Sequence, residues 1–247
     1  MLRKLLQPIY TAIVLLTFVI CLLTAFPFFL LFGSMGTAKG RKIIWHIVST
    51  WAKGWLWFIG MPLRRLGSVP NDGKYVFVAN HISYLDTIDV YAAIPTYFRT
   101  LAKIEMSRIP IFGFVYKQVT ILVDRESAQG RARSMRLMWM TLRNECSISI
   151  FPEGTFNETD APLKHFYDGA FRLAISAQIP IVPLLFPDTV KRWHYSGWYK
   201  LWPGRNRAIF LDPVPVDGLE LRDLPMLKEK VCRLMETELA KYGYPKS

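Results

Sequence analysis

The chain is poor in the residues that stabilise small secreted proteins and thiolate metal sites. Only three cysteines occur among its 247 residues, Cys21, Cys146 and Cys232, and no two of them form a Cys-x-x-Cys pair. An odd number of widely separated cysteines argues against a disulfide framework and against a metal site built from thiolates. We therefore expect a protein of a reducing, cytosolic environment.

Acidic side chains are also scarce. Nineteen Asp and Glu residues stand against 31 Lys and Arg residues, which gives a formal net charge of +12. Such an excess predicts an anionic partner, which could be nucleic acid, acidic lipid headgroups or a phosphorylated substrate. The eight tryptophans favour a lipid surface, because tryptophan gathers at the membrane–water interface. We expect membrane lipid as a partner and no nucleic acid.

Charge is missing altogether from Leu5 to Ala38. Within that stretch, Ile9–Phe32 is long and apolar enough to cross a hydrocarbon core of about 30 Å, so it predicts a membrane segment. A cleaved signal peptide is the alternative, but the run exceeds a typical signal core and lacks a clean small-x-small cleavage site. Pro27 leaves open whether the segment spans the membrane or bends back within it. The basic residues that flank it favour the cytoplasmic face of the cell membrane for the rest of the chain.

The next stretch, Ile43 to Leu66, mixes four tryptophans with basic residues, as a helix lying in the membrane interface would. The alternative is a core helix with its tryptophans buried. We expect residues 1–66 to form membrane-anchoring and interfacial helices, and residues 67–247 to form the catalytic domain.

After a turn signal at residues 70–73, short apolar runs alternate with helical stretches. The expected strands are Tyr75–Ala79, Tyr97–Ala102, Val119–Val123, Ser147–Phe151, Ile181–Phe186 and Ala208–Leu211. The expected helices are Thr87–Ala93, Ala128–Asn144, Gly169–Gln178 and Met226–Tyr242. This alternation predicts an α/β fold with a mostly parallel central sheet flanked by helices.

The segment Asn80-His81-Ile82-Ser83-Tyr84-Leu85-Asp86 follows the first of these strands. An imidazole there could take a proton from a hydroxyl at neutral pH if a carboxylate fixed its tautomer and stabilised its charged form. The segment must be a loop for the two side chains to meet. The alternative is that Asp86 only caps the helix starting at Thr87 and that His81 is a polar residue at a strand end.

Four motifs from residue 78 to 186 together resemble the glycerolipid acyltransferase family, whose best-known members are 1-acylglycerol-3-phosphate acyltransferases. They are Asn80-His81 through Asp86; Lys103-Ile104-Glu105 with Pro110, Phe112, Gly113 and Asp124-Arg125; Phe151-Pro152-Glu153-Gly154-Thr155; and Ile179-Pro180-Ile181-Val182-Pro183. Their order and spacing are similar to those of the family.

The resemblance implies a reaction, a set of site residues, and no metal or bound cofactor. His81 would deprotonate the hydroxyl of a lysophospholipid acceptor, which then attacks the thioester of acyl-CoA or acyl-carrier protein, and Asp86 would hold the imidazole. Lys103 and Arg125 would contact the acceptor phosphate. Glu153 would bind glycerol hydroxyls or anchor its loop. Backbone amides near Gly154 and Thr155 could stabilise an oxyanion, although a plain tight turn is the alternative.

One residue departs from the family pattern. An arginine thought to bind phosphate usually follows the threonine of the third motif, but Phe156 stands there in this chain. Phenylalanine cannot make a charge-assisted hydrogen bond, so either a nearby base such as Lys164 substitutes or the acceptor is not lysophosphatidate.

We expect lysophosphatidate to be acylated to phosphatidate. Three alternatives are open: an acyltransferase for another lysolipid, a non-catalytic membrane-surface binding protein, and a hydrolase using Ser83. No Gly-x-Ser-x-Gly elbow surrounds that serine, which disfavours the hydrolase.

Overall fold

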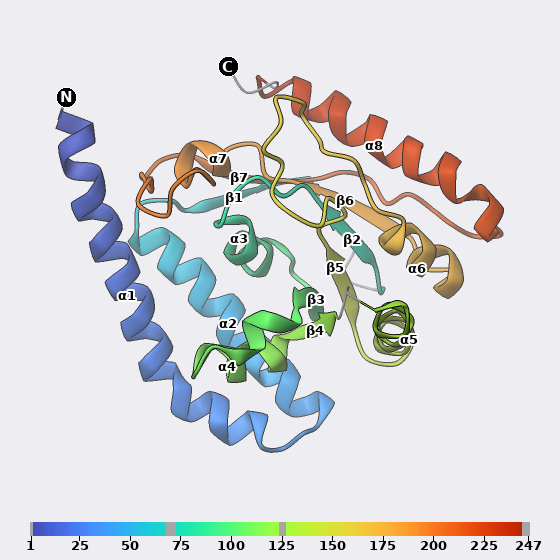
Figure 1. Ribbon diagram of the computed structural model, residues 1–247, viewed down its shortest axis with the longest axis horizontal. Coiled ribbons are helices and arrows are strands. Elements are labelled where there is room, and N and C mark those ends of the chain that lie inside the picture. Colours follow the sequence, from blue (N-terminus) through green and yellow to red (C-terminus); the bar gives the residue numbers. More distant parts are fainter. Residues whose placement is uncertain (1, 68–72, 124–126, 244–247) are drawn as a thin grey trace.

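Seven strands form one sheet in the computed structural model, which describes residues 2–67, 73–123 and 127–243 (Figure 1). They are β1 (Leu63–Leu66), β2 (Val76–Ala79), β3 (Phe98–Lys103), β4 (Thr120–Val123), β5 (Ser147–Ile150), β6 (Ile181–Leu185) and β7 (Asn206–Phe210). Their order is β1-β7-β6-β2-β5-β3-β4, and every neighbouring pair is parallel except β6 with β7. The predicted α/β fold with a mostly parallel sheet is confirmed.

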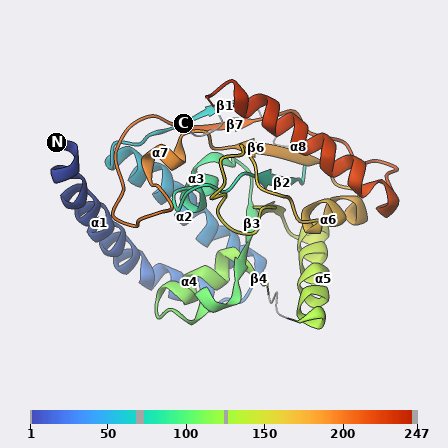
Figure 2. The same cartoon turned by 45° about the horizontal axis from the view of Figure 1, so that its top comes forward.

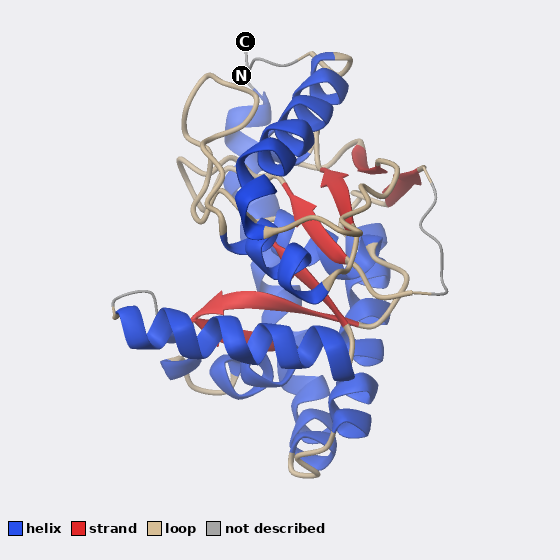
Figure 3. Ribbon diagram, turned by 90° about the vertical axis from the view of Figure 1, so that its right-hand side faces the viewer, coloured by secondary structure: helices blue, strands red, loops and turns tan. Residues whose placement is uncertain are grey.

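Helices cover both faces of this sheet (Figures 1 and 3). One face packs against α1 (Leu2–Gly33), α2 (Ala38–Phe58), α3 (Asp86–Ala93) and α4 (Phe112–Val119). The other packs against α5 (Ala128–Asn144), α6 (Gly169–Ala177) and α8 (Leu224–Ala240). Three short elements complete the described residues: the 3₁₀ turns η1 (Ile104–Arg108) and η2 (Leu221–Asp223), and α7 (Thr189–Arg192).

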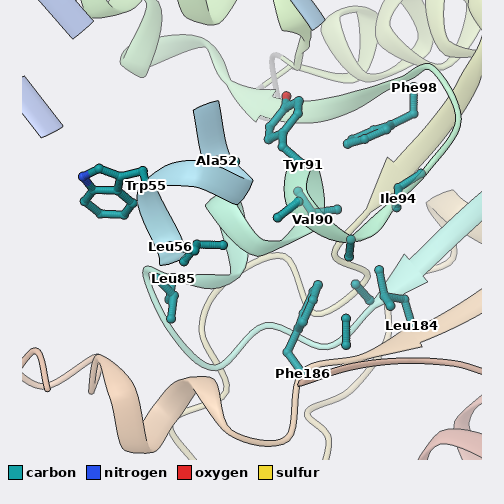
Figure 4. Close-up of a cluster of buried hydrophobic side chains, with 14 of the residues drawn as sticks. Ala52, Trp55, Leu56, Leu85, Val90, Tyr91, Ile94, Phe98, Leu184 and Phe186 are labelled. Atoms are coloured by element: carbon teal, nitrogen blue, oxygen red, sulfur yellow. The ribbon is translucent and has the colours of Figure 1, made fainter. Parts of the chain in front are cut away.

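The two cores follow from the alternation of side chains along the central strands. On β2, Phe77 and Ala79 join the core under α2 and α3, whereas Val76 and Val78 join the core under α5, α6 and α8. Figure 4 shows part of the first core, to which Leu184 of β6, Phe186 just after that strand and Val90 of α3 all belong. Because both faces are covered, β2 and β6 are apolar throughout, as buried parallel strands are.

Helix α1 is continuous through Pro27 and packs along α2 (Figures 1 and 2). The indole of Trp55 donates to the hydroxyl of Thr17 at 3.1 Å, and Val14 and Phe29 are buried. The opposite face of α1 is apolar and exposed, with Leu5, Ile9, Ile13, Leu16, Ile20, Leu23, Phe28 and Leu31. The apolar part, Leu5–Gly33, is 29 residues long. At about 1.5 Å per residue that length exceeds a hydrocarbon core of about 30 Å.

The expectation of one helix from Ile43 to Leu66 is wrong in extent. Helix α2 ends at Phe58, because Gly60 takes a left-handed conformation with φ of 71° and Pro62 follows it. Trp45 and Trp55 are buried in the core, as in the alternative interpretation, whereas Trp57 is 72% exposed.

The first 66 residues also contribute to the sheet. Strand β1 pairs in parallel with β7, Leu63 lying opposite Asn206. Neither β1 nor α4 was among the expected elements, because β1 is short and half-exposed and α4 has only eight residues. The division at residues 66 and 67 stays a prediction, with a strand from each part in one sheet.

Candidate active site

The site lies where three neighbouring parallel strands end. Strand β2 pairs with β5 on one side and β6 on the other, so the segments that follow all three strands meet at one edge of the sheet. Asn80 joins the segment after β2 to the segment after β6, since its Oδ1 accepts a hydrogen bond from the backbone N–H of Phe186 at 2.8 Å. This is the edge at which ligands bind in open α/β folds. The sequence motif contained Asn80 but gave no sign of this bond across 106 residues.

His81 and Asp86 meet at this edge. His81 Nδ1 lies 3.0 Å from Asp86 Oδ2, and the His81 side chain keeps 14% of its surface exposed while Asp86 has none. An ionised carboxylate only accepts hydrogen bonds, so Nδ1 carries the proton and Nε2 has its lone pair available. The predicted contact between the two side chains is present in the structure, and their roles as base and orienting carboxylate stay a prediction.

Asp86 organises the loop rather than capping the helix. Its Oδ2 also accepts from the backbone N–H groups of Ile82 at 2.7 Å and Ser83 at 2.8 Å. Asp86 is itself the first residue of α3, and Leu85 occupies the cap position. The alternative in which Asp86 capped a helix starting at Thr87 is therefore wrong, because its carboxylate turns back to the loop that carries His81.

The loop after β5 holds the backbone of His81 from both sides. Glu153 Oε1 accepts from the His81 N–H at 2.7 Å, and the Asn157 N–H donates to the His81 carbonyl at 2.7 Å. The second oxygen of Glu153 accepts from the Lys164 N–H at 2.9 Å. Glu153 is fully buried. Of its two expected roles, anchoring the loop is the one that these contacts describe.

Gly154 makes a tight turn. Its φ is 72°, a left-handed value that glycine adopts without strain, and its N–H donates to the Phe151 carbonyl at 3.1 Å. The Gly154 amide is thus engaged in the turn that closes β5, which was the alternative to an oxyanion contact.

Aromatic rings surround the imidazole. Phe151 stacks on His81 with ring centroids 4.3 Å apart, and Phe156 packs edge-on at 4.5 Å. Tyr84 continues the cluster, 4.8 Å from Phe156 and 5.3 Å from Trp193. These contacts fix the orientation of the imidazole and give the site an apolar wall. The sequence marked Phe156 only as a missing arginine, because its contact with His81 depends on the fold.

Ser83 is not placed as a nucleophile. Its side chain is fully buried, and its hydroxyl donates to the Trp193 carbonyl at 2.6 Å and accepts from the Leu85 N–H at 3.1 Å. Both contacts are structural, which agrees with the lack of a nucleophile elbow.

The remaining expected contact residues are Lys103, Arg125, Thr155 and Lys164. Lys103 is the last residue of β3, and its side chain lies outside the described residues, as does all of Arg125. Thr155 is exposed, and the ammonium of Lys164 donates to its hydroxyl at 2.9 Å. Among the described residues, no cluster of three or more His, Cys, Asp or Glu side chains is arranged to hold a metal ion.

Asp89 is a second buried carboxyl on α3, one turn beyond Asp86. Its Oδ1 accepts from the Asn206 amide at 2.9 Å. Burial raises the pKa of Asp89 well above its usual value, and the Asp86 and Asp188 carboxylates raise it further. Asp89 is thus held toward its neutral form. The sequence gave no signal for this residue.

The chain is similar in sequence to known acyltransferases. A family model described as Acyltransferase matches residues 63–186. The 1-acyl-sn-glycerol-3-phosphate acyltransferase alpha of Ovis aries is 30% identical over 185 residues, which cover 74% of this chain and 64% of that protein. A putative 1-acyl-sn-glycerol-3-phosphate acyltransferase of Caenorhabditis elegans is 29% identical over 199 residues, covering 79% and 68%. This chain thus spans about two thirds of the length of these relatives.

A solved structure shares the whole fold. The crystal structure of the 1-acyl-sn-glycerophosphate (LPA) acyltransferase, PlsC, from Thermotoga maritima matches with a TM-score of 0.79, covering 100% of this chain and 98% of that one. The two sequences are 20% identical, so the match establishes the arrangement of the elements.

Proposed function

Because this chain belongs to the acyltransferase family, we propose that it transfers a fatty acyl group from a thioester to the free hydroxyl of 1-acylglycerol-3-phosphate, giving phosphatidate. The donor is acyl-CoA or acyl-carrier protein. The observation that carries the proposal is the 3.0 Å contact between His81 Nδ1 and Asp86 Oδ2 at the open edge of the sheet. The names of the relatives support lysophosphatidate as the acceptor.

The geometry provides for direct transfer. His81 Nε2 takes the proton of the acceptor hydroxyl as its oxygen attacks the thioester carbonyl. The C–S bond then breaks, and the imidazolium returns its proton to the leaving thiolate, so the products are an ester and a free thiol. Asp86 stabilises the transient imidazolium and keeps Nε2 directed outward. Since Ser83 is buried and hydrogen-bonded, the mechanism involves no covalent acyl-enzyme on that residue.

Lys103 and Arg125 are proposed to contact the acceptor phosphate. The backbone of Lys103 ends β3, at the carboxyl edge of the same sheet as His81. A lysine and an arginine provide the point charge and the fork geometry that phosphate oxygens accept.

Membrane association is proposed to use the exposed apolar face of α1. One face of this helix packs on α2 and α4, while its other face presents leucine, isoleucine and phenylalanine side chains to the surroundings. Burying that face in the bilayer removes apolar surface from water, and it brings the site to the membrane that holds its lipid acceptor. We propose the cytoplasmic face of the cell membrane.

The test is an acyl-transfer assay with the purified full chain in detergent or vesicles. Acyl-CoA and acyl-carrier protein are each offered with lysophosphatidate, lysophosphatidylcholine, lysophosphatidylethanolamine and monoacylglycerol, and His81→Ala is the control. We expect turnover of lysophosphatidate by the wild type and none by His81→Ala. Turnover of a different acceptor with lysophosphatidate inert would reject the proposed substrate. Equal vesicle binding by both proteins with no transfer to any acceptor would favour a non-catalytic lipid-binding protein.

The presence of Phe156 beside His81 favours an acceptor other than lysophosphatidate. Its ring packs against His81 and Tyr84, so this position adds apolar surface beside the base instead of a cation. A lysolipid with a headgroup other than phosphate is the second candidate, and the same acceptor panel separates the two.

A further inference from the structure

Lys164 carries a cation on the loop that holds His81. Its Nζ donates to the Thr155 hydroxyl at 2.9 Å, and its side chain is half-buried. Lys228 and Lys241 are neutralised by Asp168 and Glu238. In the described part of the chain, by contrast, no carboxylate lies within ion-pair distance of the Lys164 ammonium.

The position of Lys164 is tied to that of the base. A single buried carboxylate, Glu153, accepts from the backbone N–H of His81 with one oxygen and from that of Lys164 with the other. The two residues are 83 positions apart in the sequence. Because Glu153 is fully buried, neither bond competes with water, and the bridge holds the two backbones in a fixed relation.

Phe156, which follows Thr155 in the sequence, has no charge with which to bind a phosphate. Its ring is packed on the rings of His81 and Tyr84. The loop from Glu153 to Lys164 therefore presents two different surfaces. One is the aromatic wall against the imidazole, and the other is the polar pair of the Thr155 hydroxyl and the Lys164 ammonium.

We propose that Lys164 binds the phosphate of the acceptor and selects a phosphorylated lysolipid over an uncharged one. The inference rests on the proposed function. An ammonium has three N–H donors, of which one is used at Thr155, so two remain for phosphate oxygens. Thr155 orients the ammonium and can share the same phosphate. Lys164 thus acts as a specificity residue in addition to Lys103 and Arg125. Because Lys164 provides the positive charge, the residue at position 156 can be a phenylalanine that packs on His81.

The experiment compares two acceptors that differ only in the phosphate, lysophosphatidate and monoacylglycerol with the same acyl chain. Lys164→Gln removes the charge but keeps a donor for Thr155, whereas Lys164→Arg keeps the charge. Lys230→Gln on α8 is the matched control, an exposed lysine outside the site. Thr155→Val removes the hydroxyl and leaves the ammonium. Steady-state kcat and KM are measured for each protein, and thermal unfolding checks that each is folded.

For Lys164→Gln we expect kcat/KM for lysophosphatidate to fall by about 10- to 100-fold, mainly through KM, because a hydrogen bond to a charged group is lost. Any monoacylglycerol turnover should stay within about threefold of the wild type. Lys164→Arg should recover most of the loss, and Lys230→Gln should match the wild type.

The possible failures are distinct. If the wild type does not acylate lysophosphatidate, the proposed function is rejected and this inference with it. If the wild type does so and Lys164→Gln has an unchanged KM, only the role of Lys164 is rejected. The same holds if Lys164→Gln and Thr155→Val lower turnover of both acceptors alike, since that pattern indicates a structural contact.

Discussion

Replacing Asp86 by asparagine tests the central claim that a carboxylate stabilises the charged form of His81. The two side chains are nearly isosteric, so the amide oxygen can still accept from the N–H groups of Ile82 and Ser83. The amide NH₂ then takes the place of Oδ1, a buried oxygen without a hydrogen-bond partner in the described structure. Leaving that group unpaired costs about 1–3 kcal/mol of stability, so the variant should fold with its Tm lowered by several degrees.

The expected loss of activity follows from the distance. Two unit charges at the 3.0 Å between Nδ1 and Oδ2 attract by about 5 kcal/mol at an effective dielectric constant of about 20. That attraction exists only once the imidazole has taken the proton, so it lowers the barrier to reaction. Each factor of ten in rate corresponds to about 1.4 kcal/mol, so Asp86→Asn should lower kcat by about 10³- to 10⁴-fold.

The assay follows release of the donor thiol at saturating lysophosphatidate and acyl thioester, with Tm measured on the same preparations. Asp89→Asn is the matched control, since it makes the same chemical change in a buried carboxyl one turn along α3. Its kcat should stay within about threefold of the wild type. The reasoning is refuted if Asp86→Asn folds and keeps more than about a tenth of the wild-type kcat. Asp86 would then serve only to organise the loop.

Three further predictions concern the groups around this pair. His81→Gln should abolish acyl transfer while Tm changes by only a few degrees, because the ring is partly exposed and its backbone bonds remain; measurable kcat would contradict the role of base. Glu153→Gln should lower stability by about 1–3 kcal/mol, since its NH₂ must face the N–H of His81 or of Lys164; denaturant unfolding that matches the wild type would contradict this. Burial raises the pKa of Asp89 in the folded protein above its value in the unfolded chain. The stability that this carboxyl contributes is therefore complete at a pH below the unfolded-state pKa, and it declines as the pH rises through the folded-state pKa. Asn does not ionise, so the Tm of Asp89→Asn relative to wild type should be higher at about pH 8 than at about pH 5, and an equal difference at both pH values would refute the buried, neutral state.

Much of the fold could be read from local pattern. The six expected strands and the four expected helices are found within a few residues of their expected bounds, because apolar runs and helical periodicity depend on near neighbours. Local pattern gave wrong or missing elements where tertiary contacts determine the secondary structure. Strand β1 has exposed arginines and is a strand because β7 pairs with it, and α2 stops at Gly60 rather than continuing to Leu66.

For the site, the sequence by itself determined the chemistry, because a histidine, a carboxylate five residues later and three downstream motifs specify which groups are available. Only the tertiary structure decided how those groups are used. Parallel pairing of β2 with β5 and β6 places Glu153 on the backbone of His81 and makes Phe156 a wall of the imidazole. Such contacts join residues more than 70 positions apart. They arise from strand order, which no local run of residues encodes, and so the candidate base could be predicted from sequence while its support required the fold.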